Sequence, residues 1–125
     1  MVYKKINKPY LSEEFAKKWN FQKAYGSYQE LFEDSEVDAI YIANPHAFHF
    51  DAVMQCLEHN KHVLCEKPMV LKKCQAEDVF ALAQEKGLVL LEAMKTAYAP
   101  GFIKLANIAR SGGIGRICDV EASFT

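Results

Sequence analysis

The sequence predicts an α/β fold built around part of a doubly wound parallel sheet. Three short apolar runs, at residues 37–43, 62–65 and 88–93, have the length and composition of strands. The first of them, with its β-branched and aromatic members, is typical of a parallel strand buried on both faces. Helical patterns at residues 49–60 and 73–86 separate the strands. Strands and helices that alternate at this spacing form right-handed βαβ units on one sheet.

Two helices are predicted before the first strand. Apolar residues recur at helical spacing from residue 11 to Trp19. Ser12 can cap the free amides of this helix, and the two glutamates that follow it complement the positive end of the helix dipole. Residues 27–30, Ser-Tyr-Gln-Glu, predict a capping box that opens a second, short helix through Phe32.

The later helices each have one apolar face and a recognisable end. Gly87 is placed as a left-handed stop for the helix over 73–86, and Pro100 opens a final helix that the Gly112-Gly113 pair ends. The side chains expected to face inward in the three helices are Ala52, Val53, Cys56, Leu57, Ala76, Val79, Phe80, Ala83, Ile103, Leu105, Ala106 and Ala109.

Residues 117–124 alternate as a further strand does. We therefore expect an unplaced segment over 1–10, a partial nucleotide-binding domain over 11–115, and the first strand of a C-terminal α/β domain over 116–125.

Composition excludes several classes of function. The net charge is −1, from 15 basic and 16 acidic side chains, so no field of one sign attracts nucleic acid or anionic lipid. No apolar run approaches the roughly 20 residues that span a bilayer, and the basic N-terminus is followed by no apolar segment of the kind that signal peptides carry. We expect a cytoplasmic protein. Its four cysteines have neither the spacing of a metal site nor that of a disulfide framework, so we expect reduced thiols.

Polar residues follow each of the three predicted strands. Asn44-Pro45 ends the first, Glu66-Lys67-Pro68 the second, and Glu92 the third. In doubly wound sheets, ligands bind beyond the carboxyl ends of the strands. These three loops are therefore expected to face one crevice.

Three motifs give the chain a family resemblance. They are Ala-Asn-Pro-His-Ala-Phe-His at residues 43–49, Lys-His-Val-Leu-Cys-Glu-Lys-Pro at 61–68, and Ser-Gly-Gly-Ile-Gly at 111–115. In this order and at these intervals the sequence resembles the Gfo/Idh/MocA (glucose-fructose oxidoreductase-like) family. The run Leu-Glu-Ala-Met at 91–94, followed by Thr96, leans toward its dihydrodiol-dehydrogenase-like branch.

The resemblance implies a Rossmann-like domain that binds NAD or NADP and a small hydroxylated substrate such as a sugar, cyclitol or related diol. Lys67 would be the catalytic residue, beside the nicotinamide and the reacting hydroxyl, where its ammonium can stabilise alkoxide-like charge or relay a proton. The implied cofactor-binding residues are Asn44, Pro45, His49, Glu66, Lys67, Pro68 and Glu92. The implied substrate residues are Lys95 and Tyr98.

Other interpretations of these residues stay open. Glu66 could form a plain ion pair with Lys67, and His49 could only cap or pack its helix. Glu92 could likewise be a packing residue. His46 and His49 have i, i+3 spacing, but no third ligand is evident nearby, so we expect no metal.

The sequence contains no G-x-G-x-x-G turn, the usual cradle for the cofactor pyrophosphate, and no acidic residue recognisable as the ribose ligand. NAD and NADP are therefore not distinguished. The predicted sheet lacks its first βαβ segment, and we expect the 125-residue chain by itself to be inactive. The alternative is a non-catalytic binding or regulatory module. An unpaired apolar strand over 117–124 would also present an edge for self-association.

Overall fold

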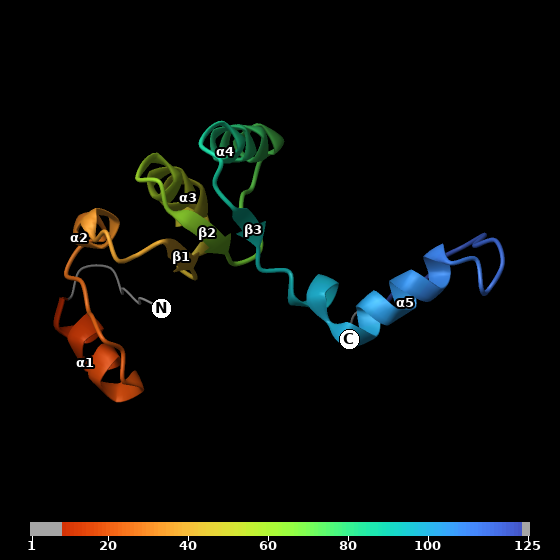
Figure 1. The fold of residues 1–125 in the computed structure, drawn as a ribbon, viewed down its shortest axis with the longest axis horizontal. Coiled ribbons are helices and arrows are strands. Elements are labelled where there is room, and N and C mark those ends of the chain that lie inside the picture. Colours follow the sequence, from red (N-terminus) through yellow and green to blue (C-terminus); the bar gives the residue numbers. More distant parts are fainter. Residues whose placement is uncertain (1–8, 124–125) are drawn as a thin grey trace. The chain divides into compact units, whose positions relative to one another are not determined.

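The computed structural model describes the backbone of residues 9–123 and the side chains of residues 12–123. These residues form two compact units that divide after Ala93. The first unit contains α1 (Pro9–Trp19), α2 (Tyr28–Glu33), β1 (Ala39–Ile42), the 3₁₀ helix η1 (His46–Phe48), α3 (His49–Glu58), β2 (His62–Cys65), α4 (Lys73–Glu85) and β3 (Leu90–Glu92) (Figure 1). The second contains the 3₁₀ helix η2 (Lys95–Tyr98) and α5 (Pro100–Arg110). The expected domain boundary after residue 115 stays a prediction.

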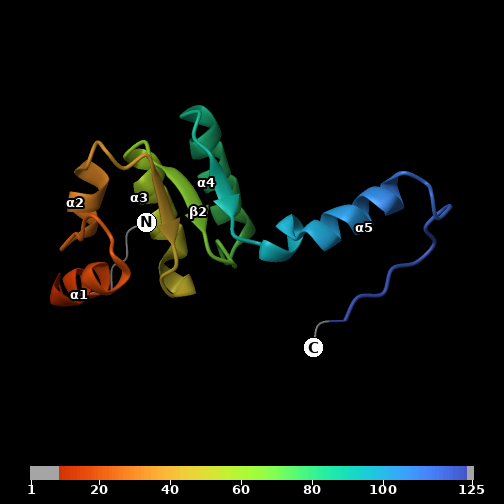
Figure 2. The ribbon, with the colours of Figure 1, turned by 60° about the horizontal axis from the view of Figure 1, so that its bottom comes forward.

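A three-stranded parallel sheet in the order β1-β2-β3 organises the first unit (Figure 2). The predicted α/β class and parallel strands are confirmed. β2 has its predicted bounds, whereas β1 and β3 are shorter than expected. In the register, Ile42 pairs with Cys65, and Cys65 pairs with Glu92. Because the three strands end at the same level, the loops that follow them leave from one edge of the sheet.

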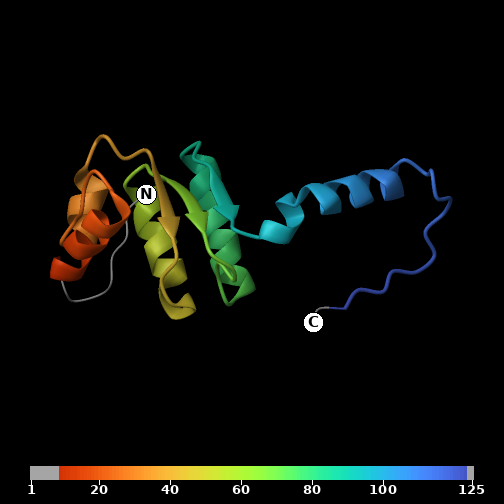
Figure 3. The same ribbon diagram turned by 90° about the horizontal axis from the view of Figure 1, so that it is seen from below.

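The helices α3 and α4 lie side by side on one face of this sheet (Figure 3). Val53 and Leu57 of α3 and Val79 of α4 are fully buried there. On the other face, the side chains of Leu64 and Leu91 are 41% and 45% exposed. The expectation that the first strand is buried on both faces is wrong, because in β1 Ile40 and Ile42 are buried whereas Ala39 is exposed and Tyr41 is only partly buried. The strands follow one another in a single direction across the sheet, so successive crossovers of one hand place both helices on the same face.

A residue in the left-handed backbone conformation follows each of the helices α3 and α4. Asn60 follows α3 with φ 59°, and Gly87 follows α4 with φ 66°, as predicted for Gly87. α3 ends two residues before the predicted limit. Within α4, Val79 and Ala83 are buried as expected, but Phe80 is half exposed, because the buried stripe is narrower than the sequence pattern suggested.

The first helix begins earlier than predicted. α1 already includes Pro9, so Ser12 lies within the helix, where it is buried, and cannot be the cap. The two glutamates after it are correspondingly not in the first turn. Proline is well suited to the first turn of a helix because its missing N–H needs no partner there. The side chain of Leu11, expected on the buried face, lies outside the described side chains.

The predicted Ser27 cap of α2 is confirmed, but the return bond of the capping box involves the amide of Gly26, one residue before the cap. The Ser27 hydroxyl accepts a hydrogen bond from the Glu30 amide at 3.1 Å, and the Glu30 carboxylate accepts one from the Gly26 amide at 2.9 Å. The two bonds satisfy amides that the first turn would otherwise leave without acceptors.

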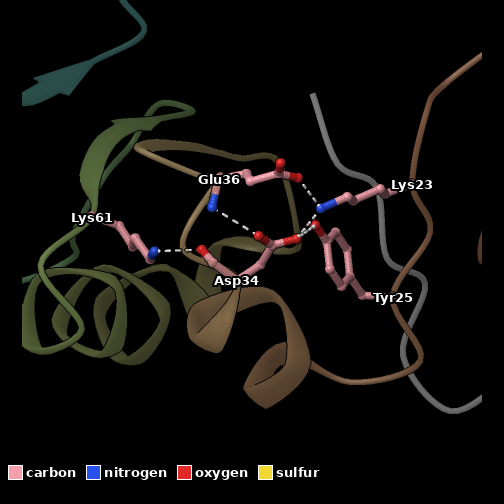
Figure 4. A network of polar contacts seen from close by, with 5 residues as sticks. All are labelled: Lys23, Tyr25, Asp34, Glu36 and Lys61. Carbon is pink, nitrogen blue, oxygen red and sulfur yellow. Dashed lines mark hydrogen bonds and ion pairs between the residues drawn. The ribbon is translucent and has the colours of Figure 1, made fainter.

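A polar network joins three connections of the first unit around Asp34 (Figure 4). Its carboxylate accepts hydrogen bonds from the Lys23 ammonium at 2.7 Å and the Tyr25 hydroxyl at 2.6 Å, and Lys23 also pairs with Glu36. The ammonium of the buried Lys61 donates to the Asp34 carbonyl at 2.8 Å. The network therefore links the segment before α2, the segment before β1 and the turn before β2.

The second unit differs from expectation in two ways. The apolar side chains expected to face inward on α5 are not buried, and Leu105 is 60% exposed. Residues 117–123 form no strand among the described residues, and Phe124 lies outside them. A strand needs a hydrogen-bonded neighbour, and no strand in this unit supplies one to the described residues. The edge expected for self-association is thus missing from 117–123.

Candidate functional site

The site predicted from sequence lies at the carboxyl edge of the sheet. Asn44 follows β1, the Glu66-Lys67-Pro68 segment follows β2, and Glu92 is the last residue of β3. The parallel register brings these three strand ends to the same level. The first unit therefore places the predicted loops beside one another, as a ligand site beyond the strand ends requires.

Glu66 is held by groups other than the Lys67 ammonium. One carboxylate oxygen accepts a short hydrogen bond from the Tyr41 hydroxyl, and the other accepts from the Lys67 amide at 3.2 Å. The pKa of Glu66 is lowered mainly by the hydrogen bond from Tyr41 and, to a smaller extent, by that from the Lys67 amide. The hydrogen bond between Tyr41 and Glu66 also raises the pKa of Tyr41. No ion pair joins Glu66 to Lys67 in the described part of the chain. The simple ion pair considered from sequence is therefore not formed.

Tyr41 was not among the residues predicted for the site. Its register partner is Leu64, one residue from the buried Val63, and its side chain is half buried. A single hydroxyl within the otherwise apolar strand was the available signal, because a partly buried hydroxyl needs a hydrogen-bond partner.

His49 joins the first two loops. Its ring is fully buried, with Nδ1 2.8 Å from the Pro68 carbonyl oxygen and Nε2 2.8 Å from the Asn44 carbonyl oxygen. The helix α3 positions this ring, since His49 is its first residue. The main chains on both sides of the edge are therefore connected through one imidazole.

Glu92 joins the second loop to the third. Its Oε1 accepts a hydrogen bond from the amide of Met69 at 2.8 Å, and the Met69 side chain is buried in the core. Glu92 is thus more than a packing residue, because it satisfies an amide that immediately follows the Lys67-Pro68 segment.

These contacts leave the Lys67 side chain available. Lys67 is exposed, and its ammonium makes no hydrogen bond or ion pair to any described residue. Its main chain is fixed on both sides, through Glu66 toward β1 and through Pro68 and Met69 toward α3 and β3. The peptide bond between Lys67 and Pro68 is cis. The edge of the sheet therefore presents one free ammonium on a loop tied to its neighbours.

Asn44 adds a second unsatisfied group. Its side-chain oxygen is buried and has no hydrogen-bond partner within the described structure, which is unusual for a buried polar atom. Pro45, next to it, is exposed. A donor from a bound molecule would give the Asn44 oxygen the partner that it lacks.

The remaining candidates are less well defined. Lys95 and Tyr98 are exposed residues of η2 in the second unit, and their roles stay predictions. The rings of His46 and His49 are in edge contact, with centroids 5.4 Å apart, but both nitrogens of His49 already face carbonyl oxygens. Across residues 12–123, no group of three or more His, Cys, Asp or Glu side chains is arranged to hold a metal ion.

Known proteins similar to this chain are oxidoreductases. Curated relatives include trans-1,2-dihydrobenzene-1,2-diol dehydrogenase from Mus musculus, 41% identical over 113 residues, which are 90% of this chain and 34% of the relative. The NADP-dependent D-xylose 1-dehydrogenase of Hypocrea jecorina is 43% identical over 95 residues, which are 76% of this chain and 24% of that enzyme. The chain therefore spans about a third or less of the length of these relatives.

Solved structures match the fold as well. An NAD-binding oxidoreductase from Klebsiella pneumoniae matches with a TM-score of 0.81 and 31% identity, over 86% of this chain and 28% of that one. A 3-ketoreductase from Actinomadura kijaniata, in complex with NADP and TDP-benzene, matches with a TM-score of 0.76 and 30% identity, over 84% of this chain and 32% of that one.

The family model described as the oxidoreductase family with an NAD-binding Rossmann fold matches residues 6–94, which include all three strands and the whole Lys67 loop. The chain belongs to the Gfo/Idh/MocA oxidoreductase family.

Proposed function

We propose that this chain forms the nicotinamide side of the active site of an NAD(P)-dependent oxidoreductase that acts on a hydroxyl or carbonyl group of a sugar, cyclitol or related diol. The observation that carries the proposal is the exposed ammonium of Lys67, unpaired among the described residues, at the edge where three strand ends meet. The names of the relatives, a diol dehydrogenase and a xylose dehydrogenase, support this substrate class.

The residues at this edge fit a nicotinamide cofactor. Asn44 offers a buried oxygen that has no partner among the described residues, and Pro45, next to it, is exposed. Pro68 and Glu92 would contribute indirectly, because their contacts with His49 and with the Met69 amide hold the main chain of the Lys67 loop. When bound, the cofactor supplies or accepts the hydride. Neither NAD nor NADP is favoured by the residues of the site.

Lys67 would act on the substrate oxygen. A lysine ammonium beside a hydroxyl or carbonyl oxygen donates a hydrogen bond and stabilises the negative charge that grows on that oxygen as the C–H bond breaks or forms. It can also exchange a proton with the same oxygen. Glu66 and His49 would contribute by fixing the main chain on either side, so that the ammonium is presented from a defined position.

A chimaera tests this function. The matching 113-residue segment of the Mus musculus dehydrogenase would be replaced by that of this chain. We expect oxidation of trans-1,2-dihydrobenzene-1,2-diol with NAD or NADP, followed by absorbance of the reduced nicotinamide. Lys67→Ala should lower kcat far more than cofactor affinity. Lys73→Ala, which removes an exposed ammonium paired only with Glu77, is the control and should leave both unchanged.

The alternative is a non-catalytic binding or regulatory module. A chimaera that folds and binds cofactor but does not turn over would support this alternative. Equal losses of kcat and cofactor affinity in Lys67→Ala would reduce Lys67 to a binding residue.

Two further expectations concern the location and the self-association of the protein. No helix in the described range is long and apolar enough to span a membrane, and we propose a cytoplasmic location. Self-association stays a prediction, for which sedimentation of the chain at several concentrations is the test.

A further inference from the structure

The environment of His49 requires two donors on one ring. Its Nδ1 and Nε2 each lie 2.8 Å from a main-chain carbonyl oxygen, of Pro68 and Asn44 respectively. Carbonyl oxygens only accept hydrogen bonds, whereas a neutral imidazole carries one N–H and one bare lone pair. In either neutral tautomer one ring nitrogen would face a carbonyl lone pair at hydrogen-bond distance. Turning the ring over would bring Cδ2 and Cε1 to the two carbonyl oxygens in place of the nitrogens, at a separation below the roughly 3.3–3.6 Å of a C–H···O contact, so the flipped ring does not fit.

We infer that His49 is held as an imidazolium, whose two N–H groups bind the carbonyls of Asn44 and Pro68 and so keep the Lys67 loop in position. His49 is thus a positioning residue, since it acts on Lys67 through the main chain of Pro68. Its protonation follows from the geometry alone. Its value for catalysis rests on the proposed function.

Other histidines of the chain provide the contrast. His62 accepts a hydrogen bond from the Val89 amide on its Nδ1 at 2.9 Å, so this nitrogen carries no proton. His59 places its Nδ1 2.8 Å from a single carbonyl, that of Gln55, which one N–H satisfies. Two acceptors on one imidazole are therefore particular to His49 among these three rings.

The charges around His49 act in both directions. Burial and the positive end of α3, where His49 is the first residue, oppose a charged ring. The two carbonyl dipoles and a nearby carboxylate favour it. The carboxylate is Glu66, whose pKa is lowered first by the Tyr41 hydrogen bond and, among smaller contributions, by the positive charge of His49.

The charged or titratable side chains nearest the ring in the chain and at the sheet edge are those of His46 from η1, Asp51 from α3, Glu66 and Lys67 after β2, and Glu92 at the end of β3; Cys56 and Glu58 of α3 and His62 and Cys65 of β2 lie on the same elements. The His46 ring is in edge contact with that of His49, with 5.4 Å between the ring centroids.

Nitrogen-15 NMR of the 125-residue chain, labelled at histidine, tests the inference without any cofactor. We expect both ring nitrogens of His49 to have the shift of protonated nitrogen at neutral pH. His62, in the same spectrum, should show one protonated and one bare nitrogen. The His49 signals are identified by their loss in His49→Gln, or through couplings to the backbone if that variant does not fold.

A rise in pH supplies the second readout. Loss of the second His49 proton should move the amide signals of Lys67 and Met69 with the same midpoint, or should coincide with unfolding. A His49 ring with one bare nitrogen in the folded chain at neutral pH would overturn the inference. So would a titration of His49 that leaves both amides unmoved. This experiment uses no cofactor, so its result does not depend on the proposed function. An inactive chimaera would not change the protonation of His49, and a His49 with one bare nitrogen would not exclude the proposed function.

Discussion

Replacement of Glu92 separates a residue that holds the Lys67 loop from one that only packs. Glu92 accepts a hydrogen bond from the amide of Met69, whose residue is 4% exposed. Glu92→Ala leaves that amide without an acceptor in a place that water reaches poorly. A buried donor without a partner costs about 1–3 kcal/mol. Glu92→Gln keeps an oxygen acceptor of the same reach, so we expect it to lose at most about 1 kcal/mol.

Urea unfolding of the 125-residue chain, followed by circular dichroism, measures this difference. If the m-value is about 2 kcal/mol per molar, a loss of about 2 kcal/mol lowers the midpoint by roughly 1 M. Glu85→Ala is the matched control, because Glu85 is an exposed glutamate at the end of α4, and its change should stay within about 0.5 kcal/mol. The reasoning is refuted if Glu92→Ala unfolds like the unmodified chain, or if Glu92→Gln is as unstable as Glu92→Ala.

Three further predictions concern the rest of the first unit. Leu57→Ala should lower the free energy of unfolding by about 2–5 kcal/mol, since Leu57 is 0% exposed, and a smaller loss in urea unfolding would place it outside the core. Burial raises the pKa of the Cys56 and Cys65 thiols to about 12, so at pH 8 a thiol reagent should modify two cysteines of the folded chain quickly and all four only after denaturation; four fast thiols would contradict this. The hydrogen bond from Lys23, and then that from Tyr25, hold the pKa of Asp34 well below its ordinary value. Because the pKa of Asp34 is lower in the folded chain than in the unfolded one, its ionised carboxylate stabilises the fold above the unfolded pKa, near 4, and this stabilisation is lost as the pH falls toward the folded pKa. The melting temperature of Asp34→Asn should therefore vary less with acid pH than that of the unmodified chain.

The sequence predicted the strands and helices of the first unit well because their periodicity is local. The apolar run before Asn44 and the left-handed Gly87 each follow from a few neighbouring residues. The three strand ends could also be placed together, since parallel strands joined by helices must end at one edge of a sheet. The loop that contains Lys67 was placed in this way, and the structure confirms that it lies at this edge, whereas the catalytic role of Lys67 came only from the family resemblance.

The contacts that hold the loop could not be predicted, because they join residues distant in sequence. Tyr41 reaches Glu66 across 25 residues, and His49 reaches Pro68 across 19. Such pairs depend on the register between strands and on the placement of α3, which no short motif specifies. The one-sided burial of the sheet was missed for the same reason. A strand pattern indicates that Leu64 is apolar and does not indicate which face a helix will cover.

The central claim is that the three strand-end loops form the nicotinamide side of a cofactor site, and titration of the labelled chain with reduced nicotinamide mononucleotide tests it most directly. This molecule carries the ring and ribose expected at the edge and lacks the adenosine end. We predict that the amide signals of Asn44, Lys67 and Glu92 shift together on one binding curve, and that adenosine diphosphate leaves them unmoved. The claim is contradicted if the mononucleotide moves none of the three, or if adenosine diphosphate moves them equally.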